Sequence, residues 1–166
     1  MIDTQELTAL VVDAEKGRPL WHLGALLSFK ALGSETGGRF WALEGLADRH
    51  MAVPLHVHSR EDEVWYVLEG EIRFIIGDEE RVGGPGTVAY IPQGVAHTFQ
   101  ILSPTARWFG FGTPAGLDQW FFETGEPAGA LTLPPPPDGP PEVEMIVATL
   151  QRYGTETVGP PPGMGG

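Results

Sequence analysis

The chain has 166 residues, of which 42% are hydrophobic, enough for one domain with its own core and too few for two ordinary domains. Its 22 acidic and 10 basic residues give a formal net charge of -12, so we expect no binding to nucleic acid or to anionic membranes, whose phosphates would repel it. The chain has no cysteine, which excludes disulfides and thiolate ligands. Without a signal-like segment or a membrane-spanning apolar run, we expect a cytoplasmic protein.

Residues 1–19 form an expected N-terminal extension, and short β-strands dominate the region that follows. From about Leu20 to Thr113, runs of Val, Ile, Phe, Trp and Tyr are separated by Gly, Pro and Asp, which is typical of a sandwich or barrel. Turns at Glu69-Gly70-Glu71 and Gly77-Asp78-Glu79 predict an antiparallel meander. The expected strands are Ala25–Ala31, Arg39–Leu46, Met51–His56, Glu63–Glu69, Glu71–Ile76, Thr87–Ile91, His97–Leu102 and Ala106–Gly112.

The expected barrel, residues 20–124, ends with Leu117–Glu123, whose sequence fits a short helix or an aromatic lid. Residues 125–141 are proline-rich and predict an extended strap. Apolar residues at helical spacing predict a C-terminal helix over 142–154, with Gly154 as its cap. Residues 155–166 are rich in Gly and Pro and predict a flexible tail.

Three histidines and one glutamate form the candidate chemical centre. His56 and His58 stand at i and i+2, so on a strand both imidazoles point to one face, about 6.6 Å apart along the strand. Glu63 opens the next strand after a short polar turn, so we expect these three groups to come from one hairpin. His97 follows a second turn, in which Gly94 provides backbone freedom. Without a metal, each buried imidazole would need its own hydrogen-bond partner, so the pattern predicts a divalent metal site.

The spacing of these residues carries a resemblance to a known family. One motif reads His56-x-His58-x4-Glu63-x6-Gly70, and a second reads Gly86-x5-Pro92-x-Gly94-x2-His97. Together they resemble the two motifs of the cupin superfamily. The motifs extend from Leu55 to His97, and the strand pattern continues the likeness to about Gly112.

The sequence departs from these motifs at two positions. His50 stands where the first motif often begins with Gly, and Ile101 stands where the second often ends with Asn. Neither position is a ligand in the family, so the departures leave the candidate metal site intact.

The resemblance implies an all-β fold, a single cupin barrel (a double-stranded β-helix, or jelly roll), here with a C-terminal α-helix. It also implies that His56, His58, Glu63 and His97 hold one divalent transition metal. Mn, Fe, Co, Ni, Cu and Zn all accept nitrogen and oxygen ligands, so the metal's identity stays open.

Within the superfamily, the one-barrel form with a strap and a C-terminal helix is most similar to bacterial quercetin dioxygenases. That likeness implies a flavonol-like or other enol-bearing aromatic substrate, and dioxygen that opens its heterocycle with loss of carbon monoxide. Glu63 would be both a ligand and the catalytic base. The alternatives are a metal-dependent isomerase or polyketide cyclase, and a non-catalytic cupin that binds a small molecule.

Apolar residues supply the candidate substrate pocket. Phe99 and Ile101 share a strand face with His97 and predict an apolar wall beside the metal. Arg60 and Arg73 are expected to lie outside. The full set of candidate pocket residues is Phe99, Ile101, Trp65 and Tyr90.

Other polar residues have ordinary structural interpretations. His22 and His50 are expected to be surface or hydrogen-bonded core residues, and Glu61 and Asp62 to belong to a solvated turn. An exposed edge strand together with an amphipathic helix predicts a homodimer.

Overall fold

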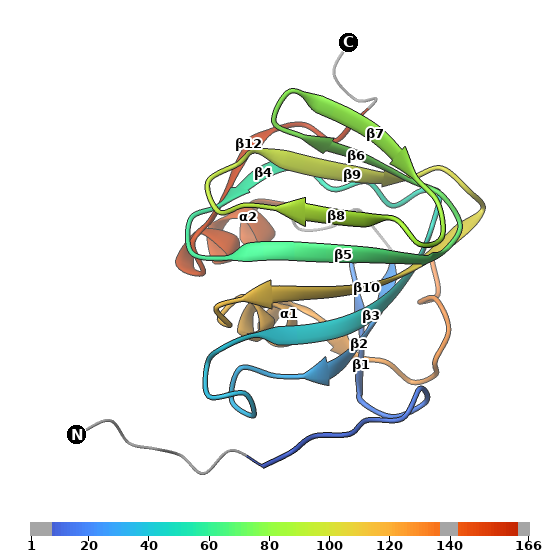
Figure 1. Ribbon diagram of the computed structural model, residues 1–166, viewed down its shortest axis with the longest axis vertical. Coiled ribbons are helices and arrows are strands. Elements are labelled where there is room, and N and C mark those ends of the chain that lie inside the picture. Colours follow the sequence, from blue (N-terminus) through green and yellow to red (C-terminus); the bar gives the residue numbers. More distant parts are fainter. Residues whose placement is uncertain (1–7, 137–142, 163–166) are drawn as a thin grey trace.

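Alternation of buried and exposed side chains builds two antiparallel sheets that face each other (Figure 1). The computed structural model describes residues 8–136 and 143–162. Along β10 (Thr105–Thr113), for example, Ala106 and Trp108 are buried while Phe109 between its buried neighbours is exposed. Each sheet therefore has one apolar inner face, and burial of the two inner faces against each other forms the core.

The first sheet contains seven strands, in the order β11 (Glu126–Pro127), β1 (Arg18–His22), β2 (Ala25–Ala31), β3 (Trp41–Asp48), β10, β5 (Asp62–Glu69) and β8 (Val88–Ile91). The second contains five, in the order β12 (Thr155–Gly159), β4 (Leu55–His58), β9 (His97–Ile101), β6 (Ile72–Ile76) and β7 (Glu79–Gly83). This arrangement, with a C-terminal helix, confirms the expected all-β jelly-roll barrel.

The expected simple meander is wrong, because consecutive strands often lie in different sheets. β5 pairs with β10 and β8, whereas β6, the next strand along the chain, pairs with β9 and β7. Gly70 lies at the crossing with a φ of 79°, and a Cβ there would stand 2.4 Å from the Thr105 carbonyl oxygen. Only glycine fits this crossing between the sheets.

Four strands escaped prediction because they are short, polar or interrupted by proline. They are β1, β7, β11 and β12. The prediction of a flexible tail from Thr155 is therefore wrong for Thr155–Gly159, which pairs with β4. Backbone hydrogen bonds to a neighbouring strand order this segment despite its weak apolar pattern.

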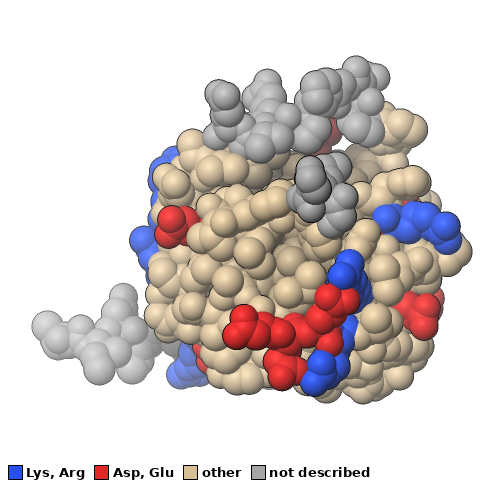
Figure 2. All heavy atoms as spheres, turned by 90° about the horizontal axis from the view of Figure 1, so that it is seen from above, with Lys and Arg blue, Asp and Glu red and all other residues tan. Residues whose placement is uncertain are grey.

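β7, an edge strand of the second sheet, is itself rich in charged residues. Glu79 and Arg81 form an ion pair, and Glu80 pairs with Arg73 on β6. Seen from above, acidic side chains gather in a strip with basic groups beside them, on a face that is otherwise largely uncharged (Figure 2). Charges of this kind oppose pairing of an open edge with another strand.

The 117–123 segment, predicted to be either a short helix or an aromatic lid, forms a short helix, α1 (Asp118–Thr124). Its Trp120 is buried, and Phe121 approaches the rings of Phe29 and Trp41 on the inner face of the first sheet, with centroid distances of 5.6 and 6.0 Å. The helix thereby adds aromatic side chains to the core.

His22 is a hydrogen-bonded core residue, as expected. Its Nε2 lies 3.0 Å from the Thr124 hydroxyl, and its ring meets the edge of Trp120 at a centroid distance of 4.7 Å. Burial lowers the pKa of His22 to about 4, so the ring is neutral at pH 7. His50, in contrast, is exposed.

The predicted C-terminal helix is α2 (Val143–Arg152), and Gly154 follows it with a φ of 82°. Its Thr149 hydroxyl accepts a hydrogen bond from the Trp120 indole at 3.1 Å, which joins the two helices. Arg152 and Tyr153 both contact the Glu123 carboxylate. No helix in the described part of the chain has the length and apolar character that a membrane span requires.

Only part of the proline-rich strap can be compared with its prediction, because residues 137–141 lie outside the described residues. Its earlier part runs beside β1. The Ala128 amide donates to the Pro19 carbonyl at 3.0 Å, and the Trp21 indole donates to the Thr132 carbonyl at 2.9 Å.

Gly45 on β3 tests how tightly the barrel interior is filled. A Cβ at this position would stand 2.2 Å from the Trp108 ring, so Gly45→Ala should lower the free energy of unfolding by about 1–3 kcal/mol. Urea denaturation would measure the change. Gly84→Ala is the matched control, because the nearest atom to its Cβ is 4.0 Å away. Equal stability of the two variants would contradict this account of the core.

Candidate metal centre

Strand pairing brings together the three histidines predicted from the sequence. His56 and His58 lie on β4 and His97 on β9, and the register of the two strands sets His56 directly opposite His97. The ring centroids of His56 lie 4.9 Å from His58 and 4.2 Å from His97. One nitrogen from each ring falls within 4.8 Å of the others, a spacing that a single metal ion can bridge.

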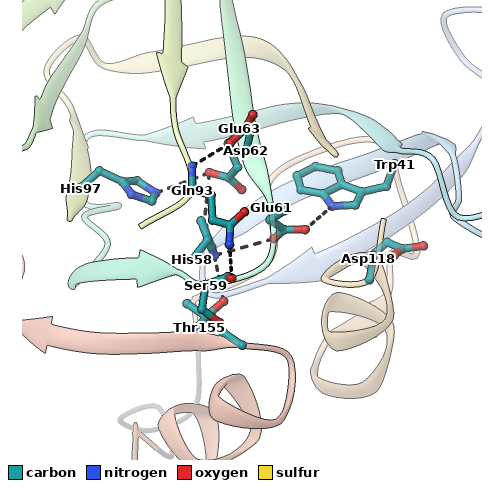
Figure 3. Close-up of polar contacts among 12 residues, drawn as sticks. Trp41, His58, Ser59, Glu61, Asp62, Glu63, Gln93, His97, Asp118 and Thr155 are labelled. Carbon is teal, nitrogen blue, oxygen red and sulfur yellow. Dashed lines mark hydrogen bonds and ion pairs between the residues drawn. The ribbon is translucent and has the colours of Figure 1, made fainter. Parts of the chain in front are cut away.

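Glu63 reaches the histidines from the opposite sheet. Its Oε2 lies 3.5 Å from Nε2 of His58 and 3.6 Å from Nε2 of His97 (Figure 3). The expectation that His56, His58 and Glu63 share one hairpin is therefore wrong, because β4 and β5 belong to different sheets. The cluster spans the barrel interior instead.

Hydrogen bonds on the far side of each ring orient the imidazoles. Nδ1 of His56 lies 2.8 Å from the Pro54 carbonyl, and Nδ1 of His97 lies 2.9 Å from the Val95 carbonyl. A carbonyl only accepts, so Nδ1 carries the hydrogen in both rings, and Nε2 is the nitrogen of each ring that is left to face the cluster. Nδ1 of His58 lies 2.8 Å from the Thr155 hydroxyl. Such outer contacts are typical of metal-binding histidines.

Two buried nitrogens lack a partner among the described residues, namely Nε2 of His58 and Nε2 of His97. Leaving a buried polar atom unsatisfied costs about 1–3 kcal/mol. Both atoms face Glu63 Oε2 at distances longer than a hydrogen bond, which leaves room for an ion between them. The donor set fits a divalent transition metal.

The charge states of the cluster also suit a cation. Burial, followed by the neighbouring imidazoles of His97 and His58, lowers the pKa of His56 to about 3, so this ring is neutral at pH 7. Burial opposes ionisation of Glu63, but His58 and His97 outweigh it and hold the pKa of Glu63 well below its usual value. Neutral imidazole and ionised carboxylate are the forms that bind metal.

Glu61 is the functional candidate that sequence reasoning missed. It was expected in a solvated turn, yet the residue is 4% exposed, and Oε1 lies 3.7 Å from Nδ1 of His58. Its Oε2 lies 3.4 Å from the Trp41 indole nitrogen. Burial, reinforced by the charge of Glu63, raises the pKa of Glu61 to about 8. The i, i+2 spacing of Glu61 and Glu63, which turns both side chains to the same side as the chain enters β5, could have revealed it.

Asp62 points the other way and has a structural role. Its carboxylate accepts hydrogen bonds from the backbone amide of Gln93 at 2.7 Å and from the Tyr90 hydroxyl at 3.1 Å. Tyr90 is 55% exposed on the outer face of the barrel, so its assignment to the pocket is wrong. It occupies an outward position of β8, whose side chains alternate between exposed and buried.

Aromatic side chains adjoin the cluster on the inner face. The Trp65 indole nitrogen lies 3.4 Å from Glu63 Oε2, and the ring stands 4.3 Å from Phe99 and 4.9 Å from Trp108 between centroids. Phe99 and Ile101 are buried. Of the predicted pocket residues, Trp65 therefore touches the cluster directly, Phe99 packs on Trp65, and Ile101 contributes to the core.

Neither of the two arginines singled out in the sequence is paired with the cluster's carboxylate. Arg73 pairs with Glu80 on the outer surface, and exposed Arg60 donates to the Arg152 carbonyl at 3.2 Å. Arg60 borders a cavity of about 230 Å³ on the Glu61 side of the barrel, which α1, α2 and the loop between β10 and α1 complete. Its lining consists of Arg60, Glu61, Pro114, Ala115, Gly116, Leu117, Gln119, Arg152 and Tyr153.

Comparison with known proteins adds a family match over the central strands. Residues 43–109 match the family model described as "Cupin domain". The uncharacterized protein SCO3923 of Streptomyces coelicolor is 33% identical over 76 residues, which cover 39% of this chain and 71% of that protein.

Solved structures share the fold at lower identity. KdgF from Halomonas sp. is 21% identical with a TM-score of 0.58, covering 67% of this chain and 99% of that chain. An RmlC-like cupin from Shewanella frigidimarina is 18% identical with a TM-score of 0.57, covering 67% and 96%. A predicted oxalate decarboxylase from Thermotoga maritima is 16% identical with a TM-score of 0.58, covering 63% and 99%. At these identities the likeness shows the fold alone.

Replacing a central imidazole should remove bound metal without unfolding the barrel. We expect His58→Ala to lose stoichiometric metal, because one of three converging nitrogens disappears while the apolar core remains. Elemental analysis with circular dichroism on the same sample would check both parts. His50→Ala is the matched control, since His50 is exposed and lies outside the cluster. Full metal content in His58→Ala would contradict the site.

Proposed function

This chain belongs to the cupin superfamily, and on that premise we propose that it is a metal-dependent enzyme. In this proposal His56, His58, Glu63 and His97 hold one divalent transition metal. The support is the convergence of one nitrogen from each of the three imidazoles, together with the two unsatisfied Nε2 atoms that face Glu63 Oε2. Four protein ligands leave a position for a substrate, as catalysis requires.

In our proposal a substrate reaches the cluster from the side of His56. His56 is of intermediate exposure as a residue, whereas His58, Glu63 and His97 are 3–6% exposed. Beyond the cluster, Trp65, Phe99 and Trp108 fill the interior. In our proposal the reacting edge of a substrate therefore enters beside His56, and the remainder of the substrate stays nearer the mouth.

Glu63 is the proposed proton acceptor. When bound, the metal would supply Lewis-acid polarisation of a substrate oxygen and, if redox-active, a means of using dioxygen. Glu63 is held ionised by its histidine neighbours, and the Trp65 indole restrains Oε2 from the side. An ionised carboxylate fixed next to the substrate's hydroxyl can accept its proton.

The surroundings of Glu63 support the proposed substrate class. The Trp65 ring lies beside Glu63, and Phe99 packs on Trp65. Arg73 is held on the outer surface by Glu80, and exposed Arg60 contacts a backbone carbonyl. This favours an enol-bearing aromatic over a small diacid or a sugar phosphate. We therefore propose a dioxygenase acting on a flavonol-like substrate.

A metal-dependent isomerase or cyclase is the second candidate. It would use the same ligands and the same Glu63 base without dioxygen, so the observation that favours it is the pairing of a fixed carboxylate with a Lewis-acid site. A non-catalytic binding protein would not need an ionised base beside the metal. The unsatisfied Nε2 atoms of His58 and His97 argue against a non-catalytic protein, because they favour a bound cation.

A homodimer remains part of the proposal. On the outer face of the first sheet, Phe109 lies opposite Tyr66, and Tyr66 lies opposite Val88. All three side chains are at least 37% exposed and together form an apolar surface that a second copy could cover. Light scattering of the purified protein would show a dimer or a monomer.

The direct test is elemental analysis followed by oxygen uptake with a panel of flavonols. About one transition metal per chain with flavonol-dependent uptake would support the dioxygenase. Metal without uptake would favour the isomerase or cyclase. No bound metal, even after incubation with each candidate ion, would overturn the metal-dependent proposal.

Glu63→Gln separates the base from the ligand set. We expect the variant to keep part of its metal, because three imidazoles remain, and to lose at least about 100-fold in turnover, because an amide cannot accept the proton. Steady-state kinetics on metal-loaded protein would measure the loss. Glu69→Gln, an exposed change at the far end of the same strand, is the control. Undiminished turnover would remove Glu63 from the base role.

A further inference from the structure

We infer that Thr155, on the C-terminal strand β12, is a positioning residue for the metal centre, an inference that rests on the proposed metal site. The residue lies outside residues 43–109, which match the family domain. It is 2% exposed, and its hydroxyl lies 2.8 Å from Nδ1 of His58 (Figure 3). A segment that sequence alone assigns to a flexible tail thus reaches the centre of the site.

Backbone pairing determines where the Thr155 hydroxyl lies. Thr155 stands directly opposite His58 in the register of β12 against β4. Just beyond this pair, the Ser59 amide and the Ser59 hydroxyl both donate to the Gly154 carbonyl at 2.8 Å. These contacts hold the start of β12 against the end of β4. The backbone of Thr155 is therefore fixed beside His58, and this fixes where the Thr155 hydroxyl lies.

The tautomer of His58 is less firmly fixed by its Nδ1 partner than the tautomers of the other two histidines are. The backbone carbonyls of Pro54 and Val95 fix the tautomers of His56 and His97, because a carbonyl only accepts. His58 has instead a hydroxyl, which can also donate. Glu63 adds a competing influence, since its Oε2 lies 3.5 Å from Nε2 of His58 and can attract a hydrogen there.

Glu61 completes the arrangement on the Nδ1 side. Its Oε1 lies 3.7 Å from Nδ1 of His58 and has no hydrogen-bond partner among the described residues. Two oxygen acceptors, the Thr155 hydroxyl and Glu61, thus surround Nδ1 and favour a hydrogen there. With that hydrogen in place, the Nε2 lone pair faces Glu63 and is available to a metal.

The experiment measures metal affinity rather than catalysis. Thr155→Val replaces the hydroxyl by a methyl of similar size, and we expect the affinity for Zn²⁺ to fall about 10–100-fold, as for loss of other outer contacts to metal-binding histidines. Competition with a chelator would give the affinity. Thr155→Ser keeps the hydroxyl and should restore binding close to that of the unmodified protein.

Two further variants keep the test decisive. Thr105→Val is the matched control, because Thr105 is an exposed strand residue that lies opposite Asp48 and outside the cluster; its affinity should not change. If Thr155→Val fails to fold, Thr155→Ala removes the hydroxyl without a second methyl and should show the same loss. The absorption spectrum of bound Co²⁺ should shift in either variant of Thr155 that lacks the hydroxyl and not in Thr105→Val.

The outcomes separate this inference from the proposed site. Unchanged Zn²⁺ affinity in a folded hydroxyl-free variant, with His58→Ala still metal-free, would overturn the role of Thr155 and leave the site standing. A loss that Thr155→Ser fails to restore would also overturn it, because the methyl and not the hydroxyl would then matter. Metal retained by His58→Ala would overturn the site itself.

Discussion

The register of β4 against β9 is the constraint on which the candidate centre depends. It sets His56 opposite His97, and the alternation along β4 turns His58 to the same inner face. β5 then brings Glu63 from the facing sheet to within 3.6 Å of two of the imidazoles. A shift of one residue in either strand would turn its ligands to the outer surface, so the fold and the site share one requirement.

Burial of the three imidazoles and Glu63 costs free energy. Hydrogen bonds within the protein offset this cost for some of the buried atoms and not for others. The Nδ1 atoms of all three histidines have oxygen partners, whereas Nε2 of His58 and of His97 have none among the described residues. The rings of Trp65, Phe99 and Trp108 pack together beside Glu63 and lower the polarity around it. Low polarity strengthens the attraction between the carboxylate and any positive charge, and this would favour a bound cation.

The elements after β10 extend the domain beyond the strands that match the family. α1 adds aromatic side chains to the core, α2 binds α1 through Thr149 and Trp120, and β12 returns the chain to β4. α1, the end of α2 and the loop before α1 border the cavity on the Glu61 side of the site. Differences between cupins that share a barrel can therefore arise in such segments, because the barrel itself hosts many reactions.

By itself, the sequence determined the all-β class, the C-terminal helix and the set of candidate ligands, because strand alternation, helical spacing and motif spacing are local properties of the chain. Only the tertiary structure decided that β4 and β5 lie in different sheets, that Tyr90 faces outward, and that Glu61 and Thr155 adjoin His58. Each of these features depends on contacts between residues far apart in the chain, or on the side of the sheet to which a side chain near a turn points. β12 illustrates the reason most clearly: TETVG has a weak apolar pattern, and its order comes from hydrogen bonds to a strand nearly a hundred residues earlier.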